Sequence, residues 1–505
     1  MIEVILSDKT YENDVYPLVK AFYSEETIKV YSGEEYVSSQ QAGDTNIAGC
    51  LSSSEGDTKT IKIEFLPGSI VTDLRIDADS TSSDRIEVDV TLTKAAYKNT
   101  LKRFLYGILS KLTGQLLPWG ILTGIRPTKL VYEMLEQGET EEAIYQKMRT
   151  EYLCSDEKIG MSLEIAGREL KLLKELDYQR GYSLYIGIPF CPSTCLYCSF
   201  TSYSAAKYSE YIERYLEALE KEIRAFAHSL PGKKLNTVYL GGGTPTTLTA
   251  EQLDRLLGLI KDQFDFTFVK EFCVEAGRPD SITVEKLEVL KKRGVDRISI
   301  NPQSMQQKTL DLIGRKHTIK QVKDAFVMAR DAGHQNINMD IIIGLPAEKP
   351  SDVADTLRQI RELNPESLTV HTLAIKRAAR LNTEKENYLD SKATGVPRML
   401  EQVIQFAKEN EYLPYYLYRQ KNMADNLENI GYAKNGMEGL YNILIMEEKQ
   451  TILALGAGGM SKFVFHKENR LERVDNVKSV LDYINRIDEM ILRKKSFLEE
   501  NITDL

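Results

Sequence analysis

Three cysteines fall within one short segment, Cys191-Pro-Ser-Thr-Cys195-Leu-Tyr-Cys198. In a protein of a reducing compartment, thiols at such close spacing indicate metal binding or catalysis rather than disulfides. The remaining cysteines are isolated in the sequence, and we expect them to be small residues of the core: Cys50, Cys154 and Cys273. The segment from Cys191 to Cys198 is therefore the first candidate for chemistry.

The number and spacing of these thiols favour an iron–sulfur cluster over zinc. A closed structural zinc site has four ligands, commonly as two pairs. No second Cys–Cys or Cys–His pair stands nearby, and the chain has 5 histidines. An iron–sulfur cluster is normally held by four thiolates. Three thiolates would leave one iron open to a substrate or cofactor, so the spacing favours a reactive cluster.

The CxxxCxxC spacing resembles that of the radical S-adenosylmethionine (SAM) superfamily. The resemblance implies a 4Fe–4S cluster held by Cys191, Cys195 and Cys198, whose open iron chelates the amino and carboxylate groups of SAM. It also implies that reduction cleaves SAM to a 5′-deoxyadenosyl radical.

From residue 182 onward, strand and helix patterns alternate strictly, which predicts a parallel sheet. The predicted strands are Ser183–Pro189, Asn236–Leu240, Glu271–Glu275, Arg297–Ile300, Asn336–Ile343 and Ser367–Leu373. The predicted helices between them are Ser209–Leu230, Ala250–Phe264, Val284–Arg293, Ile319–Ala332 and Ser351–Leu363. These units match an α/β fold, the six-stranded partial (β/α) barrel of radical SAM proteins. A Rossmann-type sheet is the alternative.

The segments on either side of this alternation predict two further domains. Residues 1–178 begin with strand patterns and continue with helical ones, which indicates an α+β domain of unknown role. Its expected strands are Ile2–Leu6, Thr60–Leu66 and Arg85–Leu92, and its expected helices are Ala95–Leu112, one beginning near Pro127, and Ile159–Leu176. Residues 179–395 would form the radical SAM domain. Residues 396–505 would form a mainly helical domain covering the site, with helices at Arg398–Glu411 and Ser479–Leu492 around a mixed stretch.

Unusual polar and glycine motifs follow the predicted strand ends, where chemistry collects in αβ barrels. Gly241-Gly242-Gly243-Thr244-Pro245-Thr246 follows the second strand and allows a ligand to approach the main chain. Glu275 ends the third strand, where it could accept hydrogen bonds from ribose hydroxyls. Arg315 could bind a carboxylate. A tight turn, a surface acid and a solvated arginine are the respective alternatives.

Asp340 stands among apolar neighbours, where a charge is expected to be paired or functional. Tyr197 lies between two of the cysteines, and packing beside an adenine or filling the core are both open for it.

Longer motifs resemble the oxygen-independent coproporphyrinogen III oxidase family over roughly residues 180 to 465. They are Tyr185-Ile-Gly-Ile-Pro-Phe-Cys191, the three cysteines, the GGGTPT run, the Gln303–Arg315 spacing, Asp340-Ile-Ile-Ile-Gly-Leu-Pro346 and the GAGGMS loop that contains Met460. The length and PWGILTGIRPTK resemble its long coproporphyrinogen dehydrogenase branch. The resemblance implies decarboxylation of coproporphyrinogen III to protoporphyrinogen IX in heme biosynthesis.

The resemblance also implies roles for individual residues. Those expected to touch the first SAM are Tyr185, Gly242, Glu275 and Met460. Those expected to touch a second SAM, which the family can hold, are Tyr197, Gly243, Thr244, Gln303, Arg315, Asp340 and Ala374. Tyr185 and Asp340 are the candidates for catalytic residues. Cations suited to an anionic tetrapyrrole are Arg126, Lys129, Lys376 and Arg377.

Some positions depart from the family pattern. Phe200 takes the place of a fourth cysteine, and Gly187 stands where the bacterial decarboxylases carry a histidine. The phenylalanine is typical of heme-chaperone relatives, but Tyr441-Asn442 stands where those have a heme-ligating histidine and an asparagine. A heme-binding chaperone and a heme-acting radical SAM methylase or ring-opening enzyme therefore remain alternatives.

Composition limits the partners and the compartment. The net charge is −9, and no basic stripe with interleaved aromatics is present, so a nucleic-acid partner is not expected. No apolar run approaches the roughly 18 residues of a membrane span, and the N-terminus does not resemble a signal peptide. We expect a cytoplasmic enzyme that uses a tetrapyrrole substrate and a small electron-transfer protein as reductant.

Overall fold

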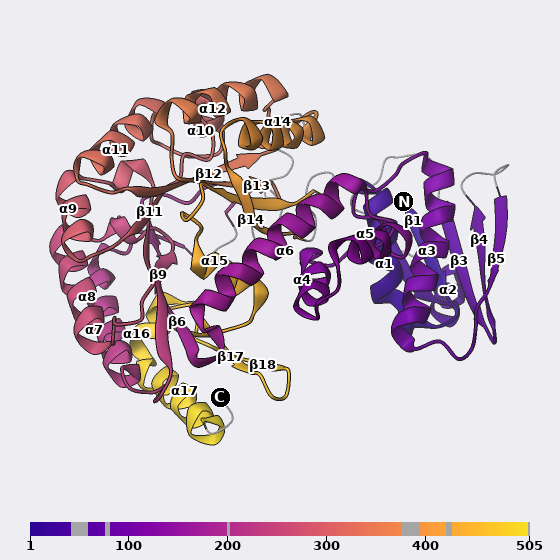
Figure 1. Ribbon diagram of the computed structural model, residues 1–505, viewed down its shortest axis with the longest axis horizontal. Coiled ribbons are helices and arrows are strands. Elements are labelled where there is room, and N and C mark those ends of the chain that lie inside the picture. The colour runs from indigo at the N-terminus through magenta and orange to yellow at the C-terminus, as the bar shows by residue number, and fades with distance from the viewer. Residues whose placement is uncertain (42–58, 76–80, 199–201, 375–392, 421–426, 503–505) are drawn as a thin grey trace. The chain divides into compact units, whose positions relative to one another are not determined.

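A computed structural model describes residues 1–41, 59–75, 81–198, 202–374, 393–420 and 427–502 of the chain (Figure 1). It divides into two compact units, Met1–Leu163 and Glu164–Leu505. None of the helices in these described ranges combines the length and the apolar character needed to cross a bilayer.

The first unit is built on a five-stranded sheet with the order β2-β1-β3-β4-β5. The strands are β1 (Ile2–Leu6), β2 (Ile28–Ser32), β3 (Lys59–Leu66), β4 (Ser69–Arg75) and β5 (Thr81–Glu87). Strand β1 pairs in parallel with β2 and β3, and β3, β4 and β5 form an antiparallel meander. The helices are η1 (Lys9–Tyr11), α1 (Glu12–Phe22), α2 (Gly33–Gln41), α3 (Lys94–Thr113), α4 (Thr128–Glu136), α5 (Glu141–Thr150) and α6 (Asp156–Leu176), which continues into the second unit.

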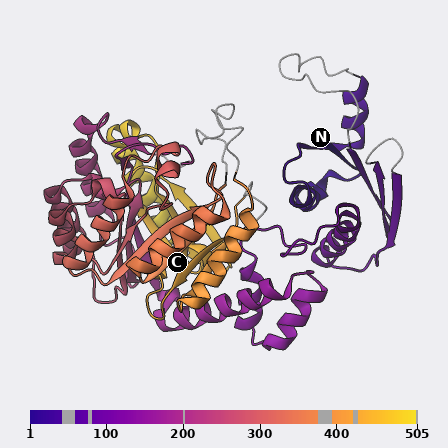
Figure 2. The same cartoon turned by 90° about the horizontal axis from the view of Figure 1, so that it is seen from above.

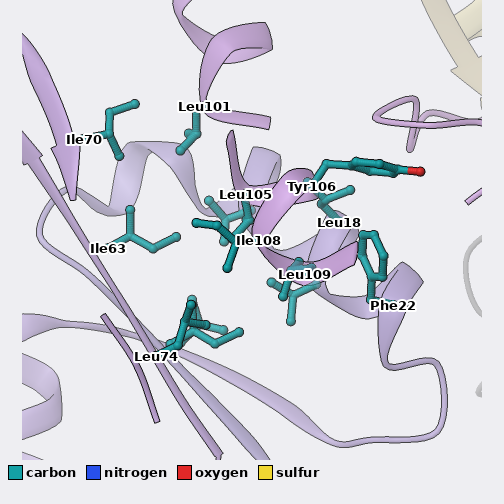
Figure 3. Packing of buried hydrophobic residues seen from close by; sticks show 14 of the residues in the cluster. Leu18, Phe22, Ile63, Ile70, Leu74, Leu101, Leu105, Tyr106, Ile108 and Leu109 are labelled. Atoms are coloured by element: carbon teal, nitrogen blue, oxygen red, sulfur yellow. The ribbon is translucent and has the colours of Figure 1, made fainter. Parts of the chain in front are cut away.

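The core of this unit lies between the sheet and helices α1 and α3 (Figure 3). Leu101, Leu105 and Ile108 recur at helical spacing on α3 and are buried, as the sequence pattern predicts. On the sheet side they meet Ile63 and Ile70. Helix α3 begins at a Thr93 cap, whose hydroxyl accepts a hydrogen bond from the main chain of Ala96.

One predicted strand of this unit is largely displaced. The expected strand Arg85–Leu92 shares only its first three residues with β5, which begins at Thr81 and ends at Glu87. Beyond it the Asp89 carboxylate accepts hydrogen bonds from the main chain and hydroxyl of Thr91, at 2.8 and 2.7 Å. Such an Asp-centred turn competes with strand pairing, and the backbone leaves the sheet there. The alternation of apolar and polar residues continues beyond this point, which is why the sequence predicted a longer strand.

The second unit contains an 11-stranded sheet whose central six strands are parallel. In sheet order these are β13 (Ser367–Thr372), β12 (Asn336–Ile343), β11 (Arg297–Ile300), β10 (Glu271–Gly277), β9 (Lys234–Gly242) and β6 (Gly181–Ile188). The helices that connect them are α7 (Ser209–Phe226), α8 (Ala250–Gln263), α9 (Val284–Lys292), α10 (Gln307–Leu312), α11 (Ile319–Asp331) and α12 (Pro350–Leu363). Figures 1 and 2 show these helices as an outer layer around the strands. The predicted partial barrel is confirmed.

Helix caps explain why several of these elements begin where they do. Thr249 and Gln252 form a reciprocal capping box at the start of α8, and Thr318 and Gln321 form another at α11. Short elements complete the connections: η2 (Tyr178–Arg180), β7 (Phe190–Cys191), β8 (Tyr203–Ser204), η3 (Pro245–Thr247) and η4 (Pro279–Ser281).

The C-terminal region adds helices and also extends the sheet at both edges. Its strands are β14 (Leu413–Tyr418), β15 (Asn429–Ala433), β16 (Thr451–Leu455), β17 (Met460–Phe465) and β18 (Arg470–Asp475). Strand β15 pairs antiparallel with β13, and β16 pairs in parallel with β6. Its helices are α14 (Val396–Glu409), α15 (Leu440–Glu447), α16 (Val480–Asn485) and α17 (Ile487–Asn501). The single helix expected at Ser479–Leu492 is therefore broken, at Arg486.

Candidate active site

The cysteine segment forms a loop that begins where β6 ends. Its base is the short parallel pair of β7 and β8, beside which the main-chain N–H of Ala205 donates to the carbonyl of Cys191 at 2.8 Å. Its middle is held by a hydrogen bond from the N–H of Leu196 to the carbonyl of Ile313, at 3.0 Å. The loop is thus attached both to its own strand and to the connection that follows β11.

A buried arginine holds the same loop from the end of β10. Arg278 Nη1 donates to the carbonyl and hydroxyl oxygens of Ser193, at 2.9 and 2.8 Å, and to Cys195 Sγ at 3.8 Å. Its Nε and Nη2 donate to the carboxylate of Asp280. A guanidinium donor stabilises the negative charge of a thiolate, which is the form of cysteine that binds metals.

The three thiols line one cavity and fit the ligand set of an iron–sulfur cluster. Burial raises the pKa of the Cys191 thiol, and a hydrogen bond from Thr244 Oγ1 at 3.5 Å opposes this. Coordination deprotonates a thiol outright, so burial is no obstacle to binding. Within the described ranges, no three His, Cys, Asp or Glu side chains converge as the ligands of a single metal ion would.

The cavity has a volume of about 730 Å³ and brings together the three cysteines and all the residues that the sequence predicted to touch SAM. These are Tyr185, Cys191, Cys195, Tyr197, Cys198, Gly242, Gly243, Thr244, Glu275, Gln303, Arg315, Asp340, Ala374 and Met460. They come from the parallel strands, from the loops that follow these strands, and from Met460, the first residue of β17. A cavity of this volume suits an organic ligand of several hundred cubic ångströms.

The glycine run after β9 is tied closely to the cysteine loop. The N–H groups of Gly243 and Thr244 donate to the carbonyls of Ile188 and Phe190, both at 2.7 Å. A Cβ on Gly243 would lie 2.6 Å from the Phe190 oxygen, so no larger residue fits there. Gly242 has a φ of +108°, which only glycine adopts readily.

Glu275 is a half-buried carboxyl on the cavity wall. The hydroxyl of Tyr239 donates to its Oε1 at 2.5 Å. Desolvation raises the pKa of Glu275, the Tyr239 hydrogen bond and His371 lower it, and the charge of Asp340 raises it, so that the pKa is about 7. Its remaining lone pairs are suited to accepting hydrogen bonds from a ligand.

The wall after β11 carries buried polar atoms that have no partner in the described structure. Arg315 donates to the Asn301 carbonyl at 2.6 Å and to the Tyr197 hydroxyl at 3.1 Å, but its Nε is unpaired. The side-chain oxygens of Asn301 and Gln303 are also unpaired. Gln303 has a positive φ of 67° and is held by its N–H to the Asp340 carbonyl. Unsatisfied buried groups are rare, so these atoms fit a polar ligand.

The loop that leads into Met460, the first residue of β17, is positioned by a buried ion pair. The N–H of Gly456 donates to Glu222 Oε2 at 2.8 Å. Lys494 Nζ donates to the other oxygen of Glu222 at 2.8 Å, and both side chains are completely buried. Met460 itself lines the cavity where this loop ends.

An aromatic stack from three elements forms another part of the wall. Tyr239 and Tyr441 stack with ring centroids 4.3 Å apart, and Tyr185 lies 6.3 and 6.2 Å from them. The start of α15, which carries Tyr441, is fixed by the buried carboxylate of Glu271, which accepts from the N–H of Leu440 at 2.7 Å. The C-terminal region therefore contributes directly to the cavity.

Comparison with known proteins assigns this arrangement. The sequence profile of the radical SAM superfamily matches residues 185–360. A protein of Bacillus subtilis (strain 168), the oxygen-independent coproporphyrinogen-III oxidase-like protein HemZ, is 42% identical over 407 residues, which are 80% of this chain and 81% of that protein. The chain belongs to the oxygen-independent coproporphyrinogen III oxidase family of radical SAM proteins. Membership of this superfamily implies a 4Fe–4S cluster and SAM.

Other members of this family differ in function. The heme chaperone HemW of Lactococcus lactis subsp. lactis (strain IL1403) is 30% identical over 328 residues, 64% of this chain and 81% of that protein. Among solved structures, coproporphyrinogen III oxidase (HemN) from Escherichia coli, a radical SAM enzyme, covers 64% of this chain and 73% of its own, with a TM-score of 0.50 and 22% identity. This structural likeness shows the fold.

The family departures can be partly placed. Gly187 lies in β6, and Tyr441 and Asn442 line the cavity from α15. Lys129 pairs with Glu133 on the first unit at 3.4 Å. Arg126, also on the first unit, is half-buried. Four further positions singled out in the sequence lie outside the described residues: Cys50, Phe200, Lys376 and Arg377.

The sequence analysis did not single out several residues that line the cavity. Arg278, Asn338, His371, Tyr418 and Lys462 all line it. None belongs to a recognisable motif. For Asn338 the signal was strand alternation, since it lies two residues before Asp340 and faces the same side.

Proposed function

We propose that this protein decarboxylates coproporphyrinogen III to protoporphyrinogen IX without oxygen, as a radical SAM oxidoreductase in heme biosynthesis. The observation that carries the proposal is the 42% identity to a coproporphyrinogen-III oxidase-like protein over most of both chains. The convergence of the cysteines, the glycine run and Asp340 on one cavity supports it.

The cluster would be held by Cys191, Cys195 and Cys198. When bound, the cluster and SAM supply a 5′-deoxyadenosyl radical that takes a β-hydrogen from a propionate, so that carbon dioxide and one electron leave and a vinyl group remains. The reduced electron-transfer protein that we expect as partner would donate an electron to the cluster. A separate acceptor would take the electron that the substrate loses.

The protein's own residues would bind and orient. The residues proposed for the first SAM are Tyr185, Gly242, Glu275 and Met460, and those for a second SAM are Tyr197, Gly243, Thr244, Gln303, Arg315, Asp340 and Ala374. Glu275 would accept hydrogen bonds from ribose hydroxyls, and the unpaired Nε of Arg315 would donate to a ligand oxygen. The main chain at Gly242 and Gly243 allows close approach without side-chain obstruction.

A heme chaperone is the second candidate, favoured by the 30% identity to HemW over 81% of that protein. Such a protein would bind heme in the same cavity without releasing a modified tetrapyrrole. A radical SAM enzyme that methylates heme or opens its ring is the third candidate on the same scaffold.

One reconstitution separates the candidates. The protein is loaded anaerobically with iron and sulfide, then given reductant, SAM and coproporphyrinogen III, and the products are oxidised and analysed by chromatography with mass detection. Loss of one and then two carboxyl groups together with 5′-deoxyadenosine supports decarboxylation. Deoxyadenosine without a changed porphyrin, followed by a methylated or linear product from heme, supports the third candidate. An intact cluster with heme binding and neither product supports the chaperone.

A further inference from the structure

A chain of polar side chains crosses neighbouring strands on one wall of the cavity. Asn338 and Asp340 lie two residues apart on β12, and Thr369 lies on the adjacent strand β13. Thr369 Oγ1 donates to Asn338 Oδ1 at 3.2 Å, and Asn338 Nδ2 donates to Asp340 Oδ1 at 2.6 Å. These hydrogen bonds hold Oδ1 of Asp340 in place.

His371 faces the other oxygen of Asp340. Its Nε2 lies 3.9 Å from Asp340 Oδ2, and its Nδ1 is hydrogen-bonded to the Tyr418 hydroxyl at 3.3 Å. A hydrogen-bond partner on one ring nitrogen fixes the orientation of the imidazole ring, and with it the direction in which the other ring nitrogen points. The side chain of His371 is 30% exposed and lines the cavity, so a ligand can reach it.

We propose that His371 is a positioning residue for Asp340. Held by Tyr418, its imidazole keeps the Asp340 carboxylate oriented to accept hydrogen bonds from an ammonium or N–H group of the ligand. The inference deepens the proposed function, because it rests on Asp340 as a ligand-binding residue.

Binding of SAM to the cluster-loaded protein, without reductant or porphyrinogen, tests the positioning role. His371→Ala is expected to weaken SAM binding by roughly tenfold in calorimetry, equivalent to about 1.4 kcal/mol. Added imidazole should restore binding, because the truncated side chain leaves an open space of the same shape beside Tyr418. His371→Phe fills that space and should not be rescued. His228→Ala, at an exposed position of the second unit, is the matched control. Affinity equal to that of the control, or a loss that imidazole does not relieve, overturns the inference.

The measurement of SAM binding does not involve porphyrinogen. A protein whose His371 variants behave as expected, but which still fails to decarboxylate coproporphyrinogen III, would disprove the proposed function and leave the inference standing.

Discussion

Lys494 and Glu222 form an ion pair at 2.8 Å, although both side chains are completely buried. Lys494 comes from α17, near the end of the chain, and Glu222 from α7, the first helix after the cysteine loop. The same carboxylate accepts hydrogen bonds from Gly456 N–H, from Asn476 and from the Tyr483 hydroxyl, at 2.8, 2.9 and 2.6 Å. The C-terminal helix therefore helps to position the loop that brings Met460 to the cavity.

Lys494→Met should destabilise the protein by roughly 3–5 kcal/mol, because it leaves the Glu222 charge buried without its cation. Urea unfolding measures this. Lys221→Met is the control, since Lys221 pairs with Asp488 on the surface and should change stability by about 0.5 kcal/mol or less. If the two variants unfold alike, the buried pair has no special role in stability. Adding Glu222→Gln to Lys494→Met should recover part of the loss.

Arg278→Gln should lower the amount of cluster that the protein retains after reconstitution. The change removes charged hydrogen bonds to Ser193, each worth roughly 1.5–3 kcal/mol, and the donor beside Cys195. Iron content and cluster absorbance are the measurements. Arg293→Gln, which breaks an ion pair with Asp254 on another helix, should retain full cluster content. Equal cluster content in both variants would mean that Arg278 serves only the fold.

Cys195→Ser should abolish cluster-dependent cleavage of SAM, because two thiolates remain for a cluster that needs three. Production of 5′-deoxyadenosine under reducing conditions is the measurement. Cys154→Ala removes a buried thiol of the first unit, which contacts the Trp119 carbonyl, and should leave cleavage intact. Normal cleavage by Cys195→Ser would refute the ligand assignment.

The barrel was predictable from sequence because each parallel strand is a short apolar run followed by a helical pattern. Arg297–Ile300 and Asn336–Ile343 coincide with β11 and β12 residue for residue. Strand β16 was not predicted as part of this sheet, since it pairs with β6 across most of the chain length. The pattern of apolar and polar residues within a segment does not show which distant segment pairs with the edge strand of a sheet.

The candidate site divides in the same way. Motif residues such as Gly243 and Cys195 could be found, because clustered glycines and cysteines at fixed spacing seldom occur unless a close main-chain approach or a bound metal requires them. Arg278 and His371 are single polar residues whose partners, Ser193 and Asp340, lie far away in sequence. Only the packing of adjacent strand ends brings these pairs together.

Asp340→Asn should reduce product formation strongly while leaving cluster content unchanged. The substitution keeps the shape of the side chain and removes the negative charge that Asn338 and His371 face. Porphyrin products per hour, normalised to iron content, are the measurement. Unchanged turnover would return Asp340 to a purely structural role, and a parallel loss of cluster would show that it supports the fold.

Glu275→Gln should change how stability depends on pH. The unfolded carboxyl titrates near 4.5, whereas burial raises the folded pKa to about 7. Between these values the unfolded chain has lost the proton that the folded protein keeps, so the free energy of unfolding falls as pH rises, by about 1.4 kcal/mol per pH unit from this group. Below pH 4.5 the group contributes no such dependence, and above pH 7 the loss of stability is complete.

The glutamine variant lacks this pH-dependent component, so denaturant unfolding between pH 5 and 7 should show its stability rising relative to the unaltered protein. Glu210→Gln, at an exposed position of α7, is the control. A constant difference between the variant and the unaltered protein across this range would mean that Glu275 is already ionised in the folded cavity, with an additional cation or donor beside it.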